Sequence, residues 1–166
     1  MAKIDDPALD PNQSYESAMR DLIARRWAAV WSAVPAAVAG EDIEGVHDVR
    51  VASRRLRAAM DVAVACFPAK WYAPLHRVAK EITGALGEVR DRDVMIESLT
   101  KARKKAAAGE HPGIDRLIDR LERERDIARE EMVRYLDALM TGDVPREVEE
   151  RFGPGAAAAS QSKDAA

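Results

Sequence analysis

The stretch that decides the fold covers residues 46–57 and reads Val46-His47-Asp48-Val49-Arg50-Val51-Ala52-Ser53-Arg54-Arg55-Leu56-Arg57. Apolar residues, joined by one serine, recur here and beyond at intervals of three and four positions. The set consists of Val46, Val49, Ser53, Leu56, Met60 and Val64. Side chains at these intervals lie on the same side of an α-helix. The stretch therefore predicts a helix that turns one apolar face toward a core.

A row of cations borders this predicted face. His47, Arg50, Arg54 and Arg57 fall within a stripe about 80° wide, because each residue turns about 100° around a helix axis. Neighbouring cations are separated by about 4.5 to 6 Å along the axis, at a rise of about 1.5 Å per residue. A row with this spacing suits a polyanion whose charges repeat at short, regular intervals.

The alternative interpretation is a solvated face on which the arginines form ordinary ion pairs. Two observations weigh against it. Asp48 is the only acid in residues 46–57, and a second group of apolar and small residues occupies the far side of the helix. That group consists of Val51, Ala52, Ala58, Ala59 and Val62. We therefore expect a helix that packs on two sides and carries its cations between them.

Composition limits the class of protein. The chain has 166 residues, of which 47% are hydrophobic, 33% charged and 5% aromatic, as expected for one helical domain. The single cysteine, Cys66, excludes an internal disulfide and most cysteine-based metal sites. No apolar run is long enough for a membrane span, and no signal sequence opens the chain. A cytoplasmic location is therefore expected.

The charge is unevenly distributed although the net charge is only -3. Residues 46–57 carry four bases and one acid, and residues 70–109 carry nine bases and five acids. The flanking segments are acidic, with four bases and eight acids in residues 1–45 and eight bases and thirteen acids in residues 110–151. This distribution concentrates positive potential in the middle of the chain, while the net charge disfavours non-specific nucleic-acid binding.

Periodicity predicts an all-α fold, an antiparallel four-helix bundle. The helices are expected at residues 11–38, with Asp10 as N-cap, from after Asp42 to about residue 67, from residue 71 to about 99, and at residues 114–140. The third keeps its phase across Gly84 and Gly87, so one long helix with a kink is expected there. The domain boundaries follow: residues 1–10 as a flexible N-terminus, 11–141 as the bundle, 142–152 as a short extension and 153–166 as a disordered tail.

A second group of charges lies on the third predicted helix, in the run Arg90-Asp91-Arg92-Asp93. Asp93 shares the inward phase of Val89 and Ile96. A carboxylate near a core needs a partner, and the arginines of the preceding helix are the expected ones. Such a carboxylate would orient a guanidinium whose free edge faces a ligand.

The two groups together resemble the CHAD domain, the conserved histidine α-helical domain. The resemblance rests on His47-Asp48-Val49-Arg50 through Arg57, followed by Leu86-Gly87 and Arg90-Asp91-Arg92-Asp93-Val94. It implies an all-helical fold without catalysis of its own and a basic cavity that binds inorganic polyphosphate. The positions that it assigns to phosphate are His47, Arg50, Arg54, Arg55, Arg57, Lys80 and Arg90. Asp91 and Asp93 fill the family's acidic positions, whereas Arg92 stands at a position that is usually apolar.

The resemblance covers one of the two four-helix halves that such domains contain. Polyphosphate binding is thus expected together with a homodimer or a second half on another chain, joined through the second apolar face defined by Val51 and Val62. Nucleic-acid backbone binding and a purely structural or oligomerisation role remain the alternatives. No catalytic residue, metal or other cofactor is expected, and no membrane partner. Polyphosphate granules are a candidate location within the cytoplasm.

Overall fold

The computed structural model describes residues 11–154 and 156, and within this part every element is helical. The α-helices are α1 (Tyr15–Ala39), α2 (Ile43–Val62), α3 (Ala69–Ala85), α4 (Gly87–Arg103), α5 (His111–Thr141) and α6 (Val144–Phe152), with a short 3-10 helix at Ala108–Glu110 before α5. The predicted all-α class is confirmed. The predicted flexible N-terminus and, of the predicted tail, residues 155 and 157–166 lie outside the described residues, while Gly153 and Ala156 are buried.

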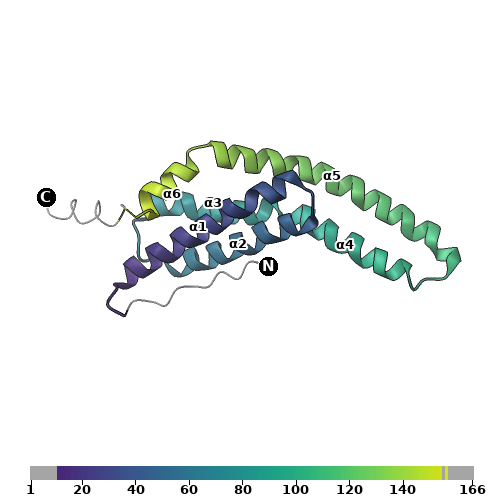
Figure 1. Cartoon of the computed structure of the whole chain (residues 1–166), viewed down its shortest axis with the longest axis horizontal. Coiled ribbons are helices and arrows are strands. Elements are labelled where there is room, and N and C mark those ends of the chain that lie inside the picture. The colour runs from purple at the N-terminus through teal and green to yellow at the C-terminus, as the bar shows by residue number, and fades with distance from the viewer. Residues whose placement is uncertain (1–10, 155, 157–166) are drawn as a thin grey trace.

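The helices form two regions of different thickness (Figure 1). In the body, helices α1, α2, α3 and α6 pack together with the C-terminal half of α5. Beyond the turn between α1 and α2, α4 and the N-terminal half of α5 continue side by side as a two-helix arm, residues 94–127. None of the described helices combines the length and the apolar composition needed to cross a membrane.

Local capping sets the ends of α1 and the start of α2. The N-cap of α1 is Ser14, whose hydroxyl accepts a hydrogen bond from the Ser17 amide at 3.2 Å, so the predicted start at residue 11 is wrong. Gly40 ends the helix with φ 69°, a left-handed conformation that glycine adopts without strain. Asp42 then caps α2 by accepting from the Glu44 amide at 3.0 Å, and the helix starts after Asp42 as predicted.

Helix α2 ends at Val62, earlier than the predicted end near residue 67. The turn that follows brings Phe67 into the core, where its ring stacks on Tyr72 with centroids 5.2 Å apart. The inward face of α2 is buried from Val46 to Met60 as predicted, but Val64 is 54% exposed. The periodicity argument failed at Val64 because the backbone had already left the helix.

The third predicted helix is divided into α3 and α4 at Leu86. The bend lies between Gly84 and Gly87, and it is a kink without a loop. The Leu86 amide still donates to Ile82 O at 3.3 Å, and Leu86 O accepts from the Arg90 amide at 3.2 Å. The predicted helical bundle is present, but it does not consist of four full-length helices. Helix α4 leaves the body, and the predicted extension, residues 142–152, contains the additional helix α6.

Candidate functional site

The register between α2 and α3 places the central cations of the sequence motif beside α3. His76 Nε2 lies 2.7 Å from Asp61 Oδ1, and Thr83 Oγ1 donates to Ser53 Oγ at 3.1 Å. These two contacts fix an antiparallel pairing. In this pairing Arg57 of α2 is level with Lys80 of α3, because each lies midway between the two contacts.

Four side chains make up what we call the cationic row: Arg50, Arg54 and Arg57 of α2 and Lys80 of α3. Arg54, Arg57 and Lys80 are exposed, and Arg50 is half-buried. Arg50 Nη1 reaches across to Thr83 O at 3.4 Å. Gly84 and Gly87 carry no side chain there: a Cβ at Gly84 would meet nothing within 4 Å, and one at Gly87 would lie 3.6 Å from Arg50 Nη1.

One end of the row is closer to an acid than the sequence indicated. Arg57 Nε lies 3.6 Å from Asp61 Oδ2, and His76 uses the other oxygen of the same carboxylate. Asp61 lies one turn past the stretch in which Asp48 was the only acid. Both side chains of the Arg57–Asp61 pair are about half exposed (49% and 46%), so the pair is worth at most about 1 kcal/mol. Among the described residues, Arg50 and Arg54 form no ion pair and are the freer cations.

His47 and Arg55 lie elsewhere. Both line a groove of about 510 Å³ between α1 and α2, together with Arg25 and a series of small α1 side chains. Arg25 Nε is buried and has no hydrogen-bond partner among the described residues. The predicted cations of α2 therefore divide between the α3 side, which carries the cationic row, and the α1 side, which carries this groove.

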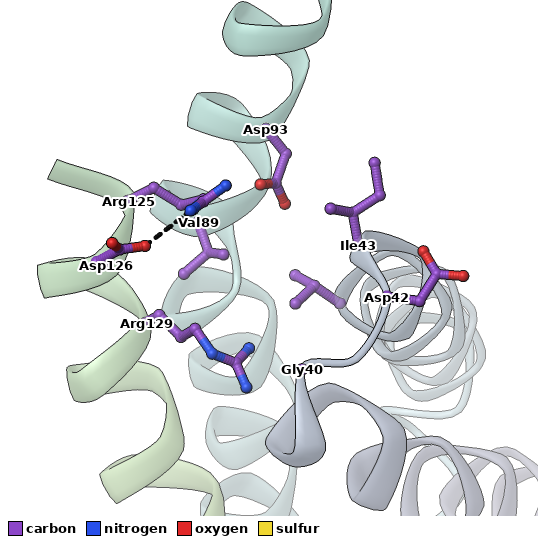
Figure 2. Close-up of a pocket in the computed structure, with 9 residues that line it drawn as sticks. Gly40, Asp42, Ile43, Val89, Asp93, Arg125, Asp126 and Arg129 are labelled. Atoms are coloured by element: carbon purple, nitrogen blue, oxygen red, sulfur yellow. Dashed lines mark hydrogen bonds and ion pairs between the residues drawn. The ribbon is translucent and has the colours of Figure 1, made fainter. Parts of the chain in front are cut away.

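A further group of charges meets at the base of the arm (Figure 2). Asp93 of α4 and Arg125 of α5 point toward one another in a pocket of about 290 Å³, beside the turn that contains Gly40. Asp93 is 5% exposed, and burial raises the pKa of its carboxyl above the ordinary value of 3.8. Arg125, Arg90 and Arg129 oppose that rise.

The partners of Asp93 correct the sequence prediction. We expected arginines of α2, whereas the cations that act on Asp93 belong to α5 and to its own helix. Periodicity could show that Asp93 faces inward, but it could not show which helix would lie opposite. Arg125 and Arg129 were missed because they stand in an acid-rich segment, although their spacing of four residues places them on one side of a helix.

Arg129 has a structural role in this pocket. Its guanidinium donates to Ala37 O at 3.0 Å and to Val38 O at 2.7 Å, closing the C-terminus of α1. These carbonyls have no partner within a helix, and a cation also complements the helix dipole there. A Cβ at Gly40 would collide with the guanidinium, so the glycine also makes room for this contact.

The remaining residues of the run at 90–93 have distinct surroundings. Arg90 is half-buried, and its Nη1 is buried without a hydrogen-bond partner in the described part of the chain. Asp91 is exposed and does not line the pocket. Arg92, which the sequence left unassigned, bridges α4 and α5: its guanidinium lies 3.0 Å from Glu88 and 3.7 Å from Glu124.

Comparison with known proteins adds one finding. A family model, described as CHAD domain, matches residues 21–166. No curated protein matches the chain, and no solved structure does. Within the described residues, no group of three or more histidine, cysteine, aspartate or glutamate side chains is placed to hold a metal ion.

Proposed function

This chain belongs to the CHAD domain family, and we propose that it binds inorganic polyphosphate without acting on it chemically. The observation that carries the proposal is the cationic row. Arg50, Arg54 and Arg57 follow one another along α2, Lys80 is level with Arg57, and the space at Gly84 of α3 is open.

The row suits a chain of phosphates on chemical grounds. A guanidinium keeps its charge at every physiological pH, and its fork matches two phosphate oxygens. Successive arginines lie about 4.5 to 6 Å apart along the helix, so neighbouring cations can engage neighbouring parts of one extended anion.

His47 and Arg55 enter the proposal as a second contact region. They line the groove on the α1 side of α2, so an anion that reached both regions would have to pass over α2. Polyphosphate is long and flexible enough for such a path, whereas a single phosphate is not. The cationic row is thus the primary site, and the groove extends it.

Asp93 supports the site indirectly. It acts on Arg90 from the interior of the arm base, and we propose that it positions this guanidinium. Asp93→Asn should then weaken polyphosphate binding, although removing a negative charge from the neighbourhood of an anion should strengthen binding by simple electrostatics. The sign of the change distinguishes a positioning carboxylate from a merely repulsive one, and tighter binding would refute the positioning role.

Two features support a binding role without catalysis. Ser53 and Thr83, the hydroxyls next to the row, hydrogen-bond to each other, and the Ser53 hydroxyl also donates to Arg50 O at 3.0 Å. His76 is engaged by Asp61. The nearby hydroxyls and the imidazole thus act as parts of the α2–α3 contact, where they hold the register of the row.

Binding of a nucleic-acid backbone is the rival for the same cations. Proteins that bind single strands generally stack bases on exposed aromatic rings. In the described part of the chain Tyr15, at 60% exposure, is the aromatic residue among the exposed large hydrophobics, and it lies in the first turn of α1. The aromatic rings Phe67, Trp71, Tyr72 and Phe152 pack against one another instead.

Titration of the full chain with polyphosphate, duplex DNA and single-stranded RNA at matched phosphate concentration tests the proposal. Polyphosphate should bind at least about tenfold more tightly than either nucleic acid, a difference of about 1.4 kcal/mol. Affinity should fall steeply with added salt, since a polyanion releases counterions when it binds. Equal affinity for all three would reduce the proposal to non-specific attraction.

The matched variants remove the same charge from two places. Arg50→Ala, Arg54→Ala and Arg57→Ala together should abolish polyphosphate binding. Arg123→Ala, Arg134→Ala and Arg146→Ala remove three exposed arginines from α5 and α6 and should leave most of the affinity. Circular dichroism controls for folding of both. Equal losses in the two variants would contradict a localised site.

A fluorescently tagged chain tests the expected cytoplasmic location at polyphosphate granules.

A further inference from the structure

The arm buries none of its residues fully. From Val94 to Ile127 every side chain is exposed or half-buried, whereas the core of the body contains many side chains with no exposure at all. Large apolar side chains on the arm face solvent: Val94 is 47% exposed, Met95 52%, Leu117 50% and Ile127 63%. Two helices can cover only one face of each other, so the arm retains apolar surface that neither helix can hide.

Part of this apolar surface lies on one side of the arm. The Arg92–Glu124 ion pair, at 3.7 Å, crosses from α4 to α5 on that side. Met95 lies one turn beyond Arg92, and Leu117 lies two turns before Glu124, so both project on the same side as the ion pair. Half-buried Leu99 and Leu121 lie between them. We call Met95, Leu99, Leu117 and Leu121 the arm face.

Charge along the arm changes sign between its two ends. The tip, residues 97–120, carries six bases and four acids. The base of the arm together with the adjoining turns of the body, residues 88–96 and 121–131, carries five bases and eight acids. If two identical arms lie side by side in opposite directions, each positive tip meets a negative base. Parallel arms would instead bring like charges together.

We propose that the arm face is the docking surface for the arm of a second copy of this chain, paired antiparallel about a twofold axis. The pairing places four helices around one apolar centre and makes each arm face the partner of the other, as an isologous contact requires. The self-complementary charge selects a second copy as the occupant. The bodies then lie at opposite ends of the dimer, with both cationic rows free to bind an anion.

This surface differs from the one that the sequence suggested for dimerisation. That surface was the second apolar face of α2, but Ala52 and Ala59 are each only 8% exposed and belong to the core of this chain. Val62 remains exposed at 65%. Two of the five residues of the α2 face are thus used within the monomer, whereas all four residues of the arm face are exposed or half-buried.

Sedimentation of the full chain at tens of micromolar, without polyphosphate, is the first test. The wild-type chain should sediment with twice the monomer mass of 18.3 kDa. Met95→Glu with Leu117→Glu should weaken the dimer at least about tenfold, as loss of central apolar contacts does. Val62→Glu with Val64→Glu adds the same charge at exposed apolar positions of the body and should leave the dimer unchanged. A monomeric wild type, or an equal effect of the two variants, would overturn the proposal.

Charge reversal tests the antiparallel arrangement by a gain of association. Lys104→Glu with Lys105→Glu makes the tip more acidic, and Glu88→Lys with Glu131→Lys makes the base more basic; all four side chains are exposed. Each variant alone should dimerise weakly, because its tips and bases then repel. Mixed together they should form a heterodimer in which both tip–base contacts attract. Failure of the mixture to associate, with both variants helical and monomeric, would overturn the antiparallel pairing.

Discussion

The body and the arm are built from helices of the same kind but have different numbers of neighbours. Trp27, Leu56 and Leu86 in the body are completely buried, whereas Ile96 and Leu99, at inward positions of α4, remain half-buried. An apolar stripe on a helix therefore shows which side will be covered. How completely it is covered depends on how many other helices reach it.

The interactions that hold the two regions also differ. The body is stabilised by buried apolar surface and by buried hydrogen bonds such as Tyr72 Oη to Met60 O, at 2.8 Å. The arm relies on exposed ion pairs along and across its helices, for example Lys101 with Glu97 and Arg103 with Asp115. Exposed pairs contribute about 0 to 1 kcal/mol each. We therefore expect the arm to open locally before the body unfolds.

Truncation of one leucine in each region should give the largest contrast. Leu56→Ala removes a completely buried side chain from α2 and should cost about 2 to 5 kcal/mol of unfolding free energy. Leu99→Ala, at a half-buried position of the arm, should cost less than about 1.5 kcal/mol. Urea denaturation at protein concentrations low enough for monomer measures both. Equal losses would show that the arm is packed as tightly as the body.

Removal of one arginine in each region is the next comparison. Arg129→Ala takes two charge-assisted hydrogen bonds from the end of α1 and should cost about 1.5 to 3 kcal/mol. Arg103→Ala breaks the ion pair with Asp115 at the tip, where both side chains are about 40% exposed, and should cost at most about 1 kcal/mol. Thermal or urea unfolding of the two variants under the same conditions shows which one loses more stability. A larger loss for Arg103→Ala than for Arg129→Ala would be inconsistent with this structure.

Glycine-to-alanine changes should have opposite signs in the two regions. In the body, a Cβ at Gly45 would lie 2.8 Å from the backbone of Ala36, so Gly45→Ala should separate α1 from α2 at a cost of about 1 to 3 kcal/mol. In the arm, a Cβ at Gly113 would meet nothing within 4 Å, so Gly113→Ala should stabilise the helix by up to about 1 kcal/mol. If both variants were destabilised in urea, the contrast between the close approach at Gly45 and the open space at Gly113 would be contradicted.

The stability of the folded chain should depend slightly on pH through Asp93, which lies at the boundary between the body and the arm. Burial raises the pKa of its carboxyl above the ordinary 3.8, so the folded chain binds this proton more readily than the unfolded chain does. Stability contributed by the group is therefore full below pH 3.8 and falls as the pH rises toward the folded-state pKa. Relative to wild type, Asp93→Asn should be more stable at neutral pH than in acid. Unfolding curves of both chains at several pH values test this, and a constant difference would exclude the effect.

Periodicity and capping signals predicted much of the local structure. The inward face of α2 from Val46 to Met60, the start of α2 after Asp42 and the kink between Gly84 and Gly87 all follow from spacing and residue type. The predicted start of α1 and the predicted end of α2 were wrong. Helix α1 starts later because Ser14 is its N-cap, and α2 ends earlier because the chain turns to bring Phe67 into the core.

The sequence by itself determined the all-helical class, the family and the order of the cations along α2, since these are properties of one helix at a time. Only the tertiary structure decided what each side chain faces. It placed Lys80 level with Arg57, turned His47 and Arg55 toward α1, and gave Asp93 its arginine neighbours from α5. The physical reason is that periodicity fixes the direction of a side chain around its own axis, whereas register and neighbours are fixed by contacts between residues distant in the sequence.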